Sequence, residues 1–257
     1  MSAPSIPLLP AKASLNPAGY CVLHRYAPAE RCAALLEQVA AYRAGYDVPT
    51  VERRERERSL RYKVIDGPAI RQFLPDIQRL YTNEVLPLVR KLSGADLVPL
   101  AHEKACVNIN ITPPGGEYRW HYDRNAVTAI LYLNAVPGGE TEMYPNYRLW
   151  LGRWKHTRAQ QLLDRLLIHP LVRRVFGWKR QVAPREGTLL VMRGDRSLHS
   201  VAPVGGSEDR INIIMSYDDP AVGMRAGAAL DTYLYTQQTV GANDPNYTGA
   251  QPPILRA

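Results

Sequence analysis

Alternation of apolar and polar residues dominates the second half of the chain. In residues 104–112, KACVNINIT, the apolar Val107, Ile109 and Ile111 alternate with Cys106 and two asparagines, as in a strand with one apolar and one polar face. Further short segments bounded by Gly, Pro or Ser predict strands at 118–123, 126–136, 187–192, 197–204 and 210–218. Short strands at this spacing are typical of a sandwich or barrel of the jelly-roll type.

The first half of the chain has helical periodicity instead. After a short predicted strand at 19–26, residues 27–45 predict a helix with Pro28 in its first turn. Residues 67–94 predict a helical stretch that prolines interrupt. Between them, 51–60 mixes charges of both signs and is interpreted as a solvated linker or helix face. The helices are expected to pack on one side of the strands.

Together these patterns predict a mainly β fold with flanking helices (α+β). We expect one domain at 19–218, with helical support at 19–96 and a β core at 97–218, because 257 residues suit one large domain. The Pro-rich residues 1–18 are expected to form a flexible tail, and the Gly/Ala/Pro-rich residues 219–257 an irregular C-terminal extension.

The cysteines and the apolar segments bear on where the protein works. Three cysteines, Cys21, Cys32 and Cys106, form no C-x-x-C pair, which argues against a disulfide framework and for a reducing compartment. No apolar run approaches the roughly 18 residues of a membrane span, and the N-terminal segment lacks the features of a signal peptide. We expect a cytoplasmic protein. Its oligomeric state is left open, with a homodimer as one option.

One group of polar residues on the predicted strands could bind a metal. His121 and Asp123 lie two positions apart, so a strand would present both on one face. His199, on a late strand, is the best third ligand, because the other histidines lie in or beside helical or basic stretches. Two histidines and one carboxylate are the arrangement of non-haem Fe(II) oxygenases. Arg210 opens the next strand and could bind the far carboxylate of a keto acid.

Several motifs around these residues occur in a fixed order. The chain contains G-x-x-Y-x-x-H-x-D, then LYLN, then GGET, and later H-S-V-x-P-V followed by a basic residue, within 113–145, 182–192 and 199–212. In this order they resemble the iron(II)/2-oxoglutarate-dependent oxygenase superfamily, in particular its prolyl 4-hydroxylase-like branch. The resemblance covers about residues 104–218, apart from a basic insertion.

The resemblance implies a double-stranded β-helix (jelly-roll, cupin-like) core and a set of site residues. It implies iron on His121, Asp123 and His199, and the C5 carboxylate of 2-oxoglutarate on Arg210. Further expected contacts of 2-oxoglutarate are Asn108, Asn110, Tyr118 and Asn212. Four residues flank the metal ligands and are expected to line the substrate pocket: Arg119, Trp120, Arg124 and Asn125. The implied cofactor is Fe(II), with 2-oxoglutarate and O2 as co-substrates and ascorbate as an activator in vitro.

The chain also departs from the family pattern. Thr112 stands where members often carry a co-substrate-binding tyrosine, and Arg210 stands where the prolyl hydroxylase branch commonly has lysine. Related halogenases lack the carboxylate ligand that Asp123 provides, so halogenation is not expected.

The implied reaction is hydroxylation of an unactivated C–H bond with release of succinate and CO2. The expected substrate is a small-molecule metabolite, carrier-bound or anionic among the options. Hydroxylation of a protein or peptide residue, and desaturation or cyclisation from the same oxidising intermediate, remain alternatives. A non-catalytic cupin-like binding module is a further alternative, against which the complete set of four site residues argues.

The positive charge of the chain is concentrated in an insertion at 146–180. The formal net charge is +8, and this segment alone holds nine Arg or Lys and one acid. An apolar stripe predicts a helix from about Arg158 to Ile168, broken near Pro170; it consists of Leu162, Leu163, Leu166 and Leu167. The helix is interpreted as docked on the core with a solvated basic face, as a lid or docking surface for an anionic substrate or an acidic carrier protein, or as a membrane-surface helix. No base-reading motif accompanies the charge, so no nucleic-acid partner is expected.

Overall fold

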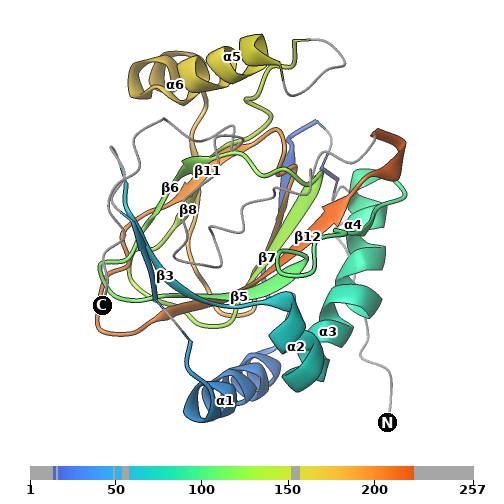
Figure 1. Ribbon diagram of the computed structural model, residues 1–257, viewed down its shortest axis with the longest axis vertical. Helices are drawn as coiled ribbons and strands as arrows, with labels where there is room; N and C mark the ends of the chain where they lie inside the picture. The colour runs from blue at the N-terminus through green and yellow to red at the C-terminus, as the bar shows by residue number, and fades with distance from the viewer. Residues whose placement is uncertain (1–13, 16, 49, 54–57, 152–156, 223–257) are drawn as a thin grey trace.

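Two antiparallel sheets form the core of the molecule (Figure 1). The computed structural model describes residues 14–15, 17–48, 50–53, 58–151 and 157–222. The larger sheet runs, in spatial order, β1 (Tyr20–Leu23), β10 (Leu189–Met192), β7 (Val127–Tyr132), β12 (Arg210–Asp218), β5 (Val107–Thr112), β3 (Leu60–Ile65) and β2 (Thr50–Arg53), with β4 (Val98–Pro99) paired to β12. The smaller sheet runs β6 (Tyr118–His121), β11 (Leu198–Val201), β8 (Thr141–Tyr144) and β9 (Arg180–Val182).

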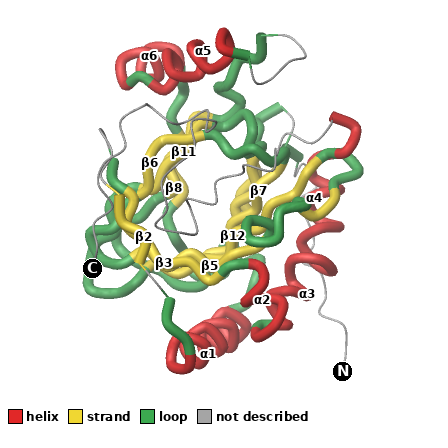
Figure 2. The backbone as a smooth tube through the Cα atoms, viewed as in Figure 1, coloured by secondary structure: helices red, strands yellow, loops and turns green. Residues whose placement is uncertain are grey.

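The predicted fold class is confirmed. The described residues form mainly antiparallel sheets with a few helices, consistent with a double-stranded β-helix, and the two sheets do not close into a barrel. Figure 2 shows the strands at the centre of the molecule and the helices outside them. Strands lie in each segment where alternation predicted one, although β6 ends at His121, so Asp123 follows the strand instead of lying on it.

One prediction about the first half of the chain was wrong. Residues 51–60 were interpreted as a solvated linker or helix face, but Thr50–Arg53 form β2, which pairs antiparallel with β3; residues 54–57 of this prediction lie outside the described residues. The reason is burial: Val51 is 2% exposed and packs in a small cluster with Leu60 and Tyr62. In the sequence Val51 stands beside charged residues, which do not suggest that it is buried.

Strand β5 shows how the core and the site share one element. Its apolar residues, Val107, Ile109 and Ile111, belong to the main hydrophobic core. Its asparagines, Asn108 and Asn110, face the opposite way but are also buried, because they line a cavity rather than solvent. The predicted alternation is therefore present with both faces covered.

Helices from the N-terminal half cover the larger sheet (Figure 1). They are α1 (Ala29–Gly45), α2 (Gly67–Phe73), α3 (Pro75–Arg79), a π-helical segment (Leu80–Val85) and α4 (Leu86–Ser93). Proline stands in the first turn of α2, α3 and α4, where its missing N–H costs no hydrogen bond. Leu35, Ile70 and Val89 join these helices to the core of the sheet, so the expected packing on one side is confirmed.

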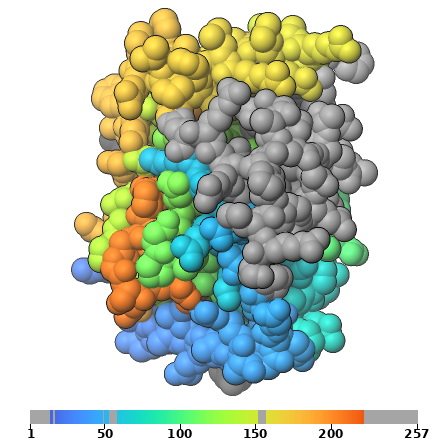
Figure 3. All heavy atoms as spheres, turned by 60° about the vertical axis from the view of Figure 1, so that its left-hand side comes forward, coloured from blue at the N-terminus to red at the C-terminus, as the bar shows by residue number. Residues whose placement is uncertain are grey.

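The insertion forms α5 (Arg158–Ile168) and α6 (Pro170–Phe176), which matches the predicted helix and the break near Pro170. Leu163 and Leu167 pack against a cluster that includes Trp120 of the smaller sheet, whereas the other two leucines of the predicted stripe point outward. Figure 3 shows this layer, in yellow and gold, across one end of the molecule, with α1, in blue, at the opposite end.

The ends of the chain add little to this description. The last described element is a 3-10 turn at Pro220–Val222. The predicted tail at 1–18 and extension at 219–257 fall almost wholly outside the described residues, and the domain limits stay predictions. No helix in the described part of the chain is long and apolar enough to cross a membrane.

Candidate functional site

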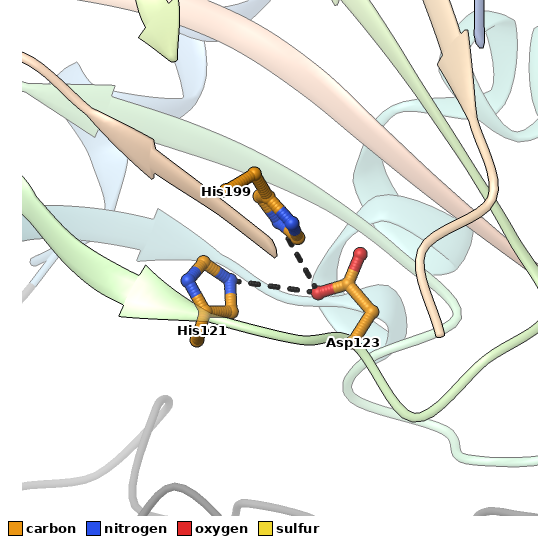
Figure 4. Close-up of side chains that lie close together, drawn as sticks. All are labelled: His121, Asp123 and His199. Atoms are coloured by element: carbon orange, nitrogen blue, oxygen red, sulfur yellow. Dashed lines mark ion pairs between the residues drawn. The ribbon is translucent and has the colours of Figure 1, made fainter. Parts of the chain in front are cut away.

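The two predicted histidine ligands are brought together by strand pairing. His121 ends β6 and lies directly opposite His199 of the neighbouring β11, with 4.1 Å between the ring centroids. Asp123 lies in the turn after β6, and its Oδ1 is 3.5 Å from the Nε2 atom of each histidine (Figure 4). Among the described residues, this is the one group of three or more His, Cys, Asp or Glu whose ligand atoms all lie within 4.8 Å of one another.

Hydrogen bonds to the backbone determine which nitrogen of each ring faces this point. Nδ1 of His121 lies 2.9 Å from the carbonyl oxygen of Arg119, and Nδ1 of His199 lies 2.9 Å from that of Ser197. A carbonyl oxygen only accepts, so each Nδ1 carries the hydrogen and each Nε2 presents a lone pair toward Asp123. Burial lowers the pKa of His199 to about 4, which keeps its ring neutral.

The carboxylate of Asp123 is held in place by groups around its other oxygen. Thr128 Oγ1 donates to Oδ2 at 2.5 Å, and the Asp123 backbone N–H donates to the carbonyl of Gly194 at 3.0 Å. An anionic oxygen and two imidazole lone pairs converging on one point fit Fe(II).

A buried cation, Arg210, occupies another part of the same cavity. Its side chain is among the largest that are fully buried, and it donates to the side-chain oxygens of Asn212 and, at 3.2 Å, Thr141. Burial lowers its pKa, its Nε has no hydrogen-bond partner, and no carboxylate of the described residues forms an ion pair with it. Glu140 acts on this guanidinium only from beyond ion-pair distance. Since a buried charge without a directly bonded counter-ion is costly, the guanidinium fits an anionic ligand such as the C5 carboxylate of 2-oxoglutarate.

The cavity lies between the two sheets and collects most of the predicted site residues. It is lined by the three metal-binding candidates and Arg210, by the predicted co-substrate contacts Asn108, Asn110, Tyr118 and Asn212, and by Arg124 and Asn125. No described residue of α5 or α6 lines it, which argues against these two helices forming a wall of this cavity.

Two predicted substrate contacts lie elsewhere. Trp120 faces the outer side of the smaller sheet, where its ring lies 5.4 Å from that of Tyr144 and 4.4 Å from the guanidinium of Arg173 on α6. Arg119 is buried but does not line the cavity; its backbone carbonyl orients His121. A substrate role for either side chain has no support from this placement.

Asn125 lines the cavity but also braces the metal site. Its Nδ2 donates to the carbonyl of Val127 at 2.8 Å and to Thr128 Oγ1 at 2.9 Å. Thr128 in turn holds Asp123, so Asn125 acts on the metal site through Thr128.

Sequence reasoning missed several residues that build the site. Thr128 and Thr141 position Asp123 and Arg210, and Tyr132 places its ring 5.2 Å from the Arg210 guanidinium while its hydroxyl donates to Thr141 at 2.7 Å. Thr128, Thr141 and Tyr132 lie inside predicted strands or recognised motifs. A polar side chain in a segment that is expected to be buried was the signal that could have identified them. Gly194 carried no signal of its own.

The comparisons with known proteins agree with this site. Residues 107–217 match the family model described as the 2OG-Fe(II) oxygenase superfamily, and no curated protein matches the chain in sequence. Similar solved structures include a Pseudomonas putida prolyl-4-hydroxylase (21% identity, 80% of this chain and 95% of that one, TM-score 0.50). They also include the epimerase SnoN (18%, 95% and 91%, 0.62) and the carbocyclase SnoK (17%, 82% and 85%, 0.63), both from nogalamycin biosynthesis.

The predicted superfamily is thereby confirmed. Residues 107–217, which hold all four predicted metal and co-substrate anchors, match the 2OG-Fe(II) oxygenase superfamily, and prolyl hydroxylases are among the structural relatives of the fold. It is an oxidoreductase of the dioxygenase type, whose cofactor is iron and whose co-substrate is 2-oxoglutarate. A structure of SnoN in complex with Fe3+ and alpha ketoglutarate is also similar to this chain (16% identity, 95% and 94% coverage, TM-score 0.58).

Proposed function

We propose that this enzyme hydroxylates an unactivated C–H bond of a small-molecule metabolite. The observation that carries the proposal is the convergence, in one cavity, of three metal-binding donors and a buried arginine without a carboxylate partner among the described residues. Bound Fe(II) with 2-oxoglutarate supplies O2-derived oxidising power for C–H cleavage, with succinate and CO2 as co-products.

The protein's own residues provide binding and orientation. His121, Asp123 and His199 hold the metal with their donor atoms already aimed, which removes the need for side-chain reorganisation on binding. Arg210 binds the distal carboxylate of 2-oxoglutarate and so fixes its position relative to the metal. The asparagines of β5 offer amide groups to the same ligand.

Aromatic, cationic and apolar groups beside the metal-binding residues also line the cavity. Tyr62, Tyr118 and Arg124 line the cavity together with Val64 and Leu100, which suits a partly apolar molecule that carries an anionic or polar group. SnoN and SnoK, described as an epimerase and a carbocyclase of nogalamycin biosynthesis, support small-molecule chemistry. They also keep cyclisation and epimerisation beside hydroxylation as outcomes to be tested.

Hydroxylation of a peptide residue is the second candidate, which the prolyl-4-hydroxylase relative supports. The acidic carrier protein, the homodimer and the cytoplasmic location predicted from the sequence stay predictions. The first two would be tested by pull-down with acyl carrier proteins and by sedimentation analysis.

The test of the chemistry is an anaerobic titration with Fe(II) and 2-oxoglutarate, followed by the charge-transfer absorption of the chelate. We expect a band for the wild type, no band for Asp123→Ala, and for Arg210→Met a dissociation constant for 2-oxoglutarate raised by about 10- to 100-fold, because a charge-assisted pair is lost. Arg165→Gln, on the exposed side of α5, is the matched control for removal of one cation.

A wild-type protein without the band would refute the proposed site. Substrate class is tested separately, by screening metabolites and proline-containing peptides for coupled succinate release and for product mass. Turnover with peptides alone would replace the small-molecule proposal while leaving the metal site intact.

A further inference from the structure

The insertion exposes large apolar side chains that the fold does not bury. Ten large apolar residues of the described chain are classed as exposed, and eight of them lie between 149 and 178. These eight are Leu149, Leu151, Leu162, Leu166, Leu171, Val175, Phe176 and Trp178. Such concentration in one segment differs from the single exposed residues that are normal on a protein surface.

The exposed residues form the outer side of the α5–α6 layer. Leu162 and Leu166 are one turn apart on α5, and Leu171 and Val175 are one turn apart on α6, so each helix presents an apolar row. The inner side is already occupied, because Leu163, Leu167 and Val172 pack toward the smaller sheet. The outer apolar rows are therefore not needed to pack the insertion against the body.

The exposed charged residues on this layer are all positive. Between 157 and 180 the exposed charged side chains are Arg158, Arg165, Arg174, Lys179 and Arg180. The one acid of this stretch, Asp164, is 1% exposed and bonded to Arg148. At the edge of the layer the Arg180 guanidinium lies 4.6 Å from the ring of Trp178, which is 76% exposed.

We propose that the α5–α6 layer is a docking surface for an anionic lipid membrane. Helices with Leu, Phe and Trp beside Arg and Lys bind in the plane of the interface, where apolar side chains enter the acyl region and the cations meet anionic headgroups. The enzyme lies on the bilayer rather than in it. The proposal rests on this surface alone and does not depend on the proposed reaction.

Two other occupants fit these residues less well. A second copy of the same surface would bring its four exposed arginines against the same four arginines, without an exposed acid of this stretch to compensate. A protein that accepts a helix in a groove reads anchors along one continuous helix face. Here the anchors are spread over two helices and both flanking segments, which suits an extended planar surface.

The experiment is co-sedimentation of the full chain with vesicles of phosphatidylcholine, with and without phosphatidylglycerol. We expect binding to the mixed vesicles and little to phosphatidylcholine alone. Phe176→Ser combined with Trp178→Ser is expected to abolish binding. Each of Arg165→Gln and Arg174→Gln is expected to weaken partitioning by about fivefold, since each removes one cation near the surface.

Control variants distinguish binding through this surface from non-specific binding. Tyr46→Ser and Lys91→Gln remove an exposed aromatic residue and an exposed cation elsewhere, and both should bind as the wild type does. Brominated lipids should quench fluorescence in the wild type, and much less in Trp178→Phe, which retains binding.

Several outcomes would overturn the proposal. These are no sedimentation with the mixed vesicles, equal losses in the control variants, or quenching that does not depend on Trp178. Concentration-dependent self-association, or capture by acyl carrier protein, that is lost in the Phe176/Trp178 variant while vesicle binding persists would assign the surface to a protein partner instead.

Discussion

At the scale of single residues, the metal site depends on free space beside Asp123 as well as on the atoms that would bind the metal. The carboxylate of Asp123 lies against Gly194, where a Cβ atom would stand 2.7 Å from Oδ2 and 2.6 Å from Thr128 Oγ1. The sequence identified the ligands through residue type and spacing. It could not identify Gly194, because the need for a missing side chain is visible only once two distant segments are folded together.

Gly194→Ala is expected to weaken Fe(II) binding by about 10- to 100-fold, the range found when groups that orient a metal ligand are disturbed. The added methyl group must displace Asp123 or break its hydrogen bond with Thr128. Anaerobic Fe(II) titration measures the effect. Gly45→Ala, where no atom lies within 4 Å of the added Cβ, is the matched control. Equal affinity in both variants would contradict the argument.

At the scale of elements, alternation predicted the strands of the core, and helical periodicity predicted α1, α5 and the proline-interrupted helices. Strands β2, β3, β4, β8 and β9 were not predicted: β4 has only two residues, and the other four are short and carry charged residues. In β8 the charge is buried: Glu142 is 3% exposed and accepts hydrogen bonds from Arg58 at 2.6 Å and Gln181 at 2.7 Å, and it forms an ion pair with Lys179 at 2.5 Å. Only the fold supplies these partners, so the sequence alone made such a strand look like a polar turn.

The partners of Glu142 make its contribution to stability dependent on pH. Burial would raise its pKa, but Lys179, Gln181 and Arg58 outweigh this and hold the pKa below its ordinary value of 4.5. A carboxyl group with a lowered pKa in the folded state stabilises above its unfolded pKa, and the contribution is lost as pH falls further. Glu142→Gln is therefore expected to destabilise the protein by about 2 kcal/mol at neutral pH, and by progressively less below pH 4.5. Urea unfolding of the wild type and the variant across this pH range measures the difference in unfolding free energy. A difference that does not change with pH would show that the charge of Glu142 is not its cause.

At the scale of the whole molecule, the insertion contains a buried ion pair whose arginine also contacts the body, because Nη1 of Arg148 donates to the carbonyl oxygen of Asp195 at 3.3 Å. Arg148 donates to Asp164 of α5 at 3.0 and 2.5 Å, and its guanidinium lies 4.2 Å from the ring of Trp150 and 4.7 Å from that of Tyr122. Two oppositely charged side chains of the basic insertion are thus turned inward. In the sequence, the only indication of this pairing is that Asp164 is a single acid among many cations.

Removal of one partner should be far more harmful than removal of both. Asp164→Ala is expected to lower the free energy of unfolding by about 3–5 kcal/mol, because it leaves the guanidinium buried and unpaired. Arg148→Met combined with Asp164→Leu should recover most of this loss. Denaturant unfolding of the wild type, both single variants and the double variant measures the coupling. Additive effects would show that the pair does not act as a unit.

The opposition of His121 and His199 on paired strands also has a consequence for how the chain folds. The two residues are neighbours in space, yet β7, β8, the entire insertion and β10 lie between them in sequence. The metal pocket therefore depends on a contact between residues that are far apart in sequence. Such a contact forms only after a long loop has closed, so we expect assembly of the pocket to be one of the slow steps of folding. Because the entropy of closing a loop grows only with the logarithm of its length, lengthening that loop by the insertion adds little to the barrier. A new surface can thus be acquired at this point of the chain without a large kinetic penalty for forming the pocket.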